Sequence, residues 1–141
     1  MAVALALLVV LILGFIDGAR WLAAWVYATE ATRYGARLAA LCTRSEQSAQ
    51  AVRSAMQAWL PELPANAAAS VVLIEYEDAQ AGASSTCTQS DCAQVSVRLQ
   101  GYSISSLGGL VSGGRLPLPT LRASVARVRL HVTSGACAAP Q

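Results

Sequence analysis

The sequence predicts an α+β protein: a long N-terminal membrane helix that continues into a helical stalk, followed by a small head. Three observations predict this fold. The chain opens with an uncharged apolar run, a segment with helical spacing follows, and three later segments alternate apolar with polar residues as half-buried strands do. In the head we expect a second helix packed on a small three-stranded antiparallel sheet. The expected parts are a transmembrane helix with its interfacial segment (1–28), a helical stalk (29–42) and a disulfide-bonded α+β head (43–141).

The composition narrows the class of protein. Of 141 residues, 55% are hydrophobic and only 13% are charged, which is more apolar than a typical soluble domain. The length excludes a large enzyme. The formal charge of +2 comes with no dense basic patch, so we expect no nucleic-acid partner.

The run from Met1 to Ile16 carries no charged side chain. A helix that is apolar on every face is typical of a membrane span rather than of a soluble helix. Its rise is about 24 Å, and continuation to Arg20 brings it close to a hydrocarbon core of about 30 Å. A cleaved signal peptide is the alternative, but the pattern passes without a break into more helix and shows no basic start.

Polar and aromatic residues mark the end of this span. Asp17 and Arg20 lie at i,i+3 and therefore share one helix face. They form either an interfacial pair that stops the helix from sliding inward, or a pair in which one charge meets the opposite charge of a neighbouring chain and sets axial register. Trp21, Trp25 and Tyr27 follow, where amphipathic aromatics collect at a membrane interface.

Two signals disagree about the side of the membrane on which the head lies. Arg33, Arg37 and Arg44 all follow the span, which by the positive-inside rule keeps the head in the cytoplasm. The even number of cysteines, all outside the apolar run, indicates an oxidising compartment instead. We favour the cysteines and expect an extracytoplasmic head, because a short basic leader ahead of the sequence would remove the conflict.

The elements of the head follow from local patterns. Residues 29–41 are mostly good helix formers, and Thr43 to Glu46 have the spacing of a capping box for a second helix over about 44–60. Strands are expected at 70–78, 93–100 and 121–132, the last with Ala126, Val128, Leu130 and Val132 on its apolar face. The segment 101–120 is rich in glycine and proline, so we expect no continuous regular structure there.

The cysteines suit a disulfide framework. Cys87 and Cys92 bracket four residues and form the obvious local pair, which leaves Cys42 to bond with Cys137. Redox catalysis is the alternative, but it needs a lowered thiol pKa, and Asp91 beside Cys92 works against that.

No pattern indicates catalysis. His131 is the only histidine and is expected on a strand surface, so it cannot build a zinc site alone. Glu75 and Glu77 are expected to form cross-strand ion pairs with Arg98, Arg127 or Arg129. We therefore expect no enzyme activity, catalytic residue, metal, cofactor or small-molecule substrate.

Two motifs resemble those of a known family. Gly14, Asp17 and Arg20 form a Gly-x-x-Asp-x-x-Arg element, and Arg33-Tyr-Gly-Ala-Arg37 forms a second, with Gly35 and Ala36 at its centre. In their order along most of the chain these elements resemble the TadE-like minor pilins of tight-adherence (Tad/Flp) type IV pilus systems.

The resemblance implies a pilin-like fold and a structural, membrane-anchored minor pilin or pseudopilin that helps to assemble, prime or cap a pilus. It implies the bacterial inner membrane or an extracellular pilus as location. Its partners would be membrane lipid and, through the N-terminal helix, other pilins and pilus assembly proteins. A membrane-tethered extracytoplasmic binding module that enters no filament is the alternative.

Overall fold

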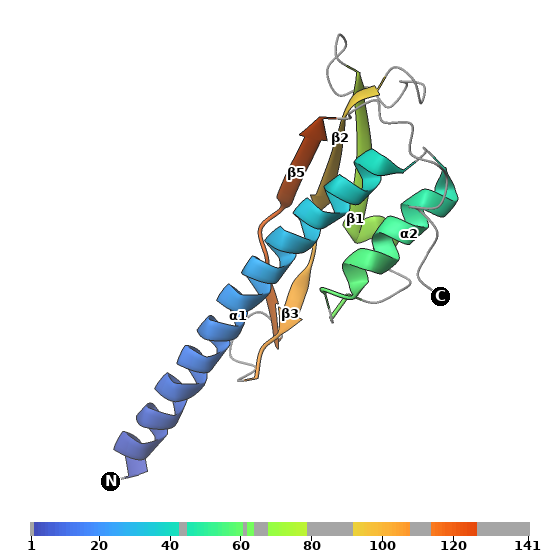
Figure 1. The fold of residues 1–141 in the computed structure, drawn as a ribbon. Coiled ribbons are helices and arrows are strands. Elements are labelled where there is room, and N and C mark those ends of the chain that lie inside the picture. Colours follow the sequence, from blue (N-terminus) through green and yellow to red (C-terminus); the bar gives the residue numbers. More distant parts are fainter. Residues whose placement is uncertain are drawn as a thin grey trace.

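A computed structural model describes residues 2–42, 45–60, 62–63, 68–78, 92–107 and 114–126. It confirms the α+β class, with a long apolar N-terminal helix, a second helix and a three-stranded antiparallel sheet (Figure 1). The elements in chain order are α1 Ala2–Leu41, α2 Glu46–Gln57, α3 Ala68–Val71, β1 Val72–Asp78, β2 Cys92–Leu99, β3 Ser103–Ser105, β4 Arg115–Pro117 and β5 Leu121–Ala126.

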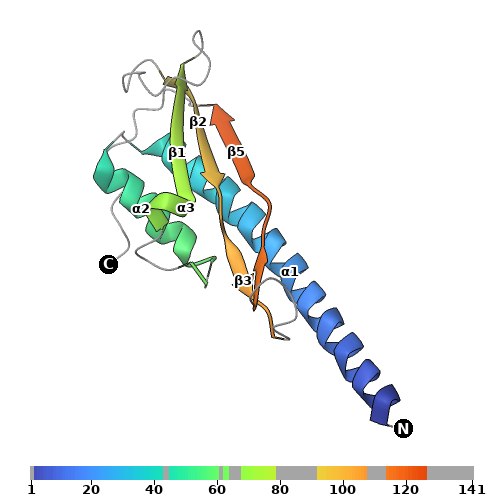
Figure 2. The same ribbon diagram turned by 180° about the vertical axis from the view of Figure 1, so that it is seen from behind.

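The N-terminal half of α1 projects away from the rest of the molecule (Figures 1 and 2). Its large apolar side chains are exposed, with Phe15 79% and Leu11 71% accessible. The helix is long and apolar enough to cross a membrane, and no residue of its most apolar stretch is buried within the protein. Apolar surface of this extent is uncommon on soluble monomers and needs a cover outside the chain.

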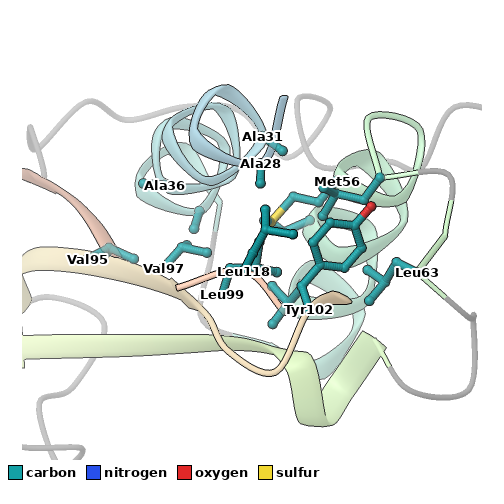
Figure 3. Packing of buried hydrophobic residues seen from close by; sticks show 14 of the residues in the cluster. Ala28, Ala31, Ala36, Met56, Leu63, Val95, Val97, Leu99, Tyr102 and Leu118 are labelled. Atoms are coloured by element: carbon teal, nitrogen blue, oxygen red, sulfur yellow. The ribbon is translucent and has the colours of Figure 1, made fainter. Parts of the chain in front are cut away.

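The C-terminal half of α1 is part of the core of the head. A stripe of small residues at helical spacing is buried: Ala28, Ala31, Thr32, Gly35, Ala36 and Ala39. Because these side chains are short, the helix backbone can approach its neighbours closely. Residues 29–41 thus belong to the same helix as the apolar run and are packed against other elements of the head. The core includes residues from both sides of the expected boundary at residue 42 (Figure 3).

The main sheet has the order β1-β2-β5, with all pairs antiparallel. Val97 of β2 lies between Ile74 and Ala123, and Val95 lies between Tyr76 and Val125, so apolar residues form rows across one face. Both valines are fully buried. The apolar face predicted for 93–100 is therefore confirmed, but Ser96, expected on the polar face, is also buried.

The packing of helix on sheet differs from our expectation. We predicted that the second helix covers the sheet, but α1 packs against β2 and β5, while α2 packs on α1. The stripe of small residues explains the difference, because it gives α1 the flatter and closer surface for the sheet.

The third strand has the opposite phase to the one we predicted. Leu121, Ala123 and Val125 are half-buried and Ala126 is exposed, so our assignment of Ala126 to the apolar face was wrong. Pairing with β2 sets this register, since Val125 lies opposite the buried Val95. Residues 127–132 lie outside the described residues.

The N-cap of the second helix is Ser45, whereas the predicted capping box began at Thr43. The helix itself begins at Glu46. The Ser45 hydroxyl accepts a hydrogen bond from the backbone N–H of Ser48 at 3.1 Å, as an N-cap does. Thr43 itself lies outside the described residues. From this start α2 places Met56 against α1 at Gly35, where no side chain intervenes.

The described parts of 101–120 contain two short strands that the sequence analysis did not predict, while residues 108–113 between them lie outside the described residues. β3 and β4 form an antiparallel two-stranded hairpin in this segment, with Ile104 opposite Leu116. Gly101, at φ 68°, and Gly114, at φ 80°, supply the left-handed conformations that flank the strands. The hairpin extends from the sheet along the middle of α1 (Figures 1 and 2).

The close approach of the Met56 side chain to Gly35 leads to a testable prediction. A Cβ atom there would lie 2.5 Å from the Met56 sulfur. We expect Gly35→Val to lower the free energy of unfolding by about 1–3 kcal/mol through overpacking, measured by denaturant unfolding of the full chain in detergent. Arg37→Val, at an exposed position of the same helix, is the control. Equal effects of both variants would contradict the packing described here.

Candidate functional site: a hairpin clamp on the membrane helix

The hairpin is held to α1 by polar contacts at the end of the apolar run. We call this contact the hairpin clamp: Asp17, Arg20 and Trp21 of α1, Glu62 after α2, and Ser105, Ser106, Leu107 and Pro117 of the hairpin. All of these residues except Asp17, Arg20 and Trp21 were missed by the sequence analysis. No local pattern links position 17 with position 106.

Asp17 binds the end of the hairpin. Its carboxylate accepts a hydrogen bond from the Leu107 backbone N–H at 2.9 Å and another from the Ser106 hydroxyl at 2.5 Å. The side chain is only 13% exposed. Hydrogen bonds to a charged group contribute about 1.5–3 kcal/mol each, so this carboxylate is a strong attachment point.

Arg20 and Glu62 bind the outward edge of β3. In this hairpin Leu118 donates to Tyr102 and Ser106 donates to Gly114, so the backbone groups of Ser105 point away from β4. Arg20 donates to the Ser105 carbonyl at 3.2 Å, and Glu62 accepts from the Ser105 N–H at 2.6 Å. The exposed edge of a very short strand is thereby satisfied by side chains.

Trp21 binds the other edge of the hairpin. Its indole N–H donates to the Pro117 carbonyl at 3.1 Å. Proline suits this edge position because it has no N–H to leave without an acceptor. Consecutive residues of α1, Arg20 and Trp21, therefore hold opposite strands of the same hairpin.

The predicted charge pair is present in this clamp. The Arg20 guanidinium lies 3.9 Å from the Asp17 carboxylate and 3.6 Å from the Glu62 carboxylate. Both charges are thus engaged within the chain, which agrees with an anchoring role. A role in register with a neighbouring chain stays a prediction.

The predicted interfacial aromatics occupy different surroundings. Trp21 is half-buried and stacks on Trp25, with ring centroids 6.1 Å apart. Trp25 is 41% exposed and Tyr27 is 56% exposed. Trp25 and Tyr27 are therefore better placed than Trp21 to meet lipid or a partner.

A shallow pocket of about 210 Å³ lies beside the clamp. Its walls are mainly small or aromatic, with one charged pair: Arg20, Ala23, Ala24, Tyr27, Trp59, Glu62, Tyr102 and Ile104. Among the lining residues, burial raises the pKa of the Tyr102 hydroxyl above 10.0, and the negative charge of Glu62 raises it further. A hydrogen bond with the backbone of Glu62 acts in the opposite direction.

The carboxylates of β1 form cross-strand ion pairs on the solvent face of the sheet. Glu75 lies 3.5 Å from Arg98 and 3.8 Å from Arg122, and Glu77 also pairs with Arg122. Arg98 is one of the predicted partners, and Arg122 is a partner that the sequence analysis did not name. The other predicted partners, Arg127 and Arg129, lie outside the described residues. These pairs stabilise the sheet.

Cys42 and Cys92 are both disulfide-bonded. Their predicted partners, Cys137 and Cys87, lie outside the described residues, so the pairing stays a prediction. His131 also lies outside them.

The motif residues lie at separate levels of α1. Gly14 has open space where a side chain would be, whereas Gly35 and the buried Ala36 face the core. Arg33 is exposed and pairs with Glu30 at 2.9 Å, and Arg37 is also exposed. The two elements of the motif therefore have different surroundings. Asp17 and Arg20 of the first belong to the clamp, whereas Gly35 and Ala36 of the second belong to the core.

The contacts of the clamp are hydrogen bonds and ion pairs that attach the hairpin to α1. Among the described residues, no three His, Cys, Asp or Glu side chains gather as a metal site would require.

No protein-family model, curated protein or solved structure matches the chain.

The Tyr102 environment predicts an alkaline loss of stability. Because the folded pKa lies above the unfolded value, the stabilisation is fully present below pH 10.0 and is lost as pH rises through the folded pKa. We expect Tyr102→Phe to remove this dependence in urea unfolding measured at increasing pH. The exposed Tyr34→Phe is the control and should retain it. A fall of the same size in Tyr102→Phe would contradict the assignment.

Proposed function

We propose that this chain is a membrane-anchored minor pilin or pseudopilin that takes part in assembling, priming or capping a Tad/Flp-type pilus. One observation carries the proposal: a single 40-residue helix has an exposed apolar half and a half that forms the core of the head. Such a helix joins the head rigidly to whatever surrounds its N-terminal half. The motif residues at both levels of this helix support the same interpretation.

The proposed location is the bacterial inner membrane, with one span and an extracytoplasmic head. The disulfide bonds of Cys42 and Cys92 support this orientation, since such bonds are rare in a reducing cytosol. They favour the cysteine argument over the count of arginines after the span.

The proposed partners are other pilins and pilus assembly proteins that contact the N-terminal half of α1. A Cβ atom at Gly14 or Gly18 would meet nothing within 4 Å inside this chain. Small residues on an apolar helix allow another helix to approach closely in a membrane. The glycines therefore suit a helix that exchanges lipid for neighbouring helices.

A membrane-tethered binding module is the second candidate. The pocket of about 210 Å³ beside the clamp favours it, because aromatic walls with one charged pair suit a small ligand or a side chain of a partner. The two candidates differ in one respect: a binding module needs the anchor but never enters a filament.

Membrane fractionation and co-purification test the proposal. We expect the full chain to resist carbonate extraction and to co-purify with pilus components. Asp17→Asn and Arg20→Gln should leave membrane insertion intact and lower co-purification, because each removes a charge at the end of the span.

Matched controls separate the effect of losing a charge at Asp17 or Arg20 from the effect of weakening the clamp. Ser106→Ala removes one hydrogen bond to Asp17, and Glu62→Gln removes the second carboxylate near Arg20, while Asp17 and Arg20 stay charged. If a control lowers co-purification as much as its partner variant, the clamp matters and the register role is wrong. Recovery of the full chain in the soluble fraction without detergent would overturn the membrane anchor and the pilin proposal together.

A further inference from the structure

Leu107 is held beside the end of the apolar run and yet is exposed. Its backbone N–H donates to Asp17 at 2.9 Å, so the residue lies at the level where the uncharged part of α1 ends. Its side chain is 61% accessible, although it is large and apolar. The described end of β3 therefore presents an apolar side chain next to the exposed surface of the helix.

A bilayer around the N-terminal half of α1 would end at this level. An ionised carboxylate is costly in hydrocarbon, which keeps Asp17 at the interface. Because the clamp fixes Leu107 to Asp17, the lipid that surrounds Phe15 also reaches Leu107.

We propose that the described end of the β3–β4 hairpin is a second membrane contact, in which Leu107 enters the boundary between headgroups and acyl chains. The inference rests on the proposed function, since it needs α1 to be in a membrane. The head would then touch the bilayer at two points, which restricts how far it can tilt about the helix.

Two features favour a lipid surface over another protein. The outward backbone groups of Ser105 are bound by Arg20 and Glu62, so this end of β3 can approach a medium of low polarity without leaving those two groups unpaired. Arg115, paired with Ser105 across the hairpin, is exposed and brings a positive charge toward anionic headgroups.

Depth-dependent fluorescence quenching tests the proposal. The full chain, with its native cysteines oxidised, is reconstituted in phosphatidylethanolamine and phosphatidylglycerol vesicles that contain lipid with a shallow nitroxide. An environment-sensitive fluorophore is attached in turn to Leu107→Cys, Phe15→Cys and Gln47→Cys. Gln47 is an exposed control near the start of α2, which follows the C-terminal end of α1. That end of α1 lies about 36 Å from Asp17, at roughly 1.5 Å per residue.

We expect the labels at 107 and 15 to be quenched several-fold more than the label at 47. If the label at 15 is quenched and the label at 107 behaves like that at 47, the second contact is wrong and the anchor stands. If the label at 15 is not quenched, the anchor of the proposed function fails. Protection of the label at 107 from both lipid nitroxide and aqueous iodide would show that this chain or a second copy of it covers the label, and would also overturn the proposal.

A second variant tests the role of the clamp. Combined with Asp17→Ala, the label at 107 should lose most of its excess quenching, while the label at 15 should keep its own. Unchanged quenching at 107 would show that Asp17 does not hold the hairpin at the membrane.

Discussion

The structure depends on one constraint: a single continuous helix must satisfy two different environments. Before Asp17 the helix exposes apolar side chains on all sides, and from Ala28 onward it buries small side chains inside the head. The two environments meet at the hairpin clamp, where Asp17 binds both Ser106 and Leu107. A polar contact at this level is less costly than one deeper in the apolar run, because water or headgroups can still reach it.

This constraint explains why the head has no core without α1. The sheet presents Val95, Val97 and Leu99, and their cover on that face is the stripe that includes Ala31 and Ala36 of the helix. A bulkier stripe would hold the helix further from β2 and leave gaps in the core. Any force on the N-terminal half of α1 is therefore transmitted directly to the head.

Local patterns in the sequence predicted the elements that depend on local chemistry. The apolar run predicted α1, helical spacing before two prolines predicted α2, and alternation predicted β1, β2 and the start of β5. The hairpin could not be predicted in this way, since β3 and β4 are three residues each and their stability comes from contacts with Arg20, Trp21 and Glu62. The charge pair of the site was visible as Asp17 and Arg20, but its partners lie more than forty positions away from it in sequence. The choice between α1 and α2 as the cover of the sheet also depended on packing that periodicity does not encode.

Amide hydrogen exchange at Leu107 tests the central claim most directly. In the full chain in micelles, the account predicts that this amide is protected by Asp17 and that Asp17→Ala speeds its exchange at least about tenfold, as loss of a hydrogen bond to a charged group implies. The amides of Val95 and Val97, in the middle of the sheet, should keep their rates. Equal exchange of Leu107 in both proteins would show that the hairpin is held by something other than the carboxylate at the end of the apolar run.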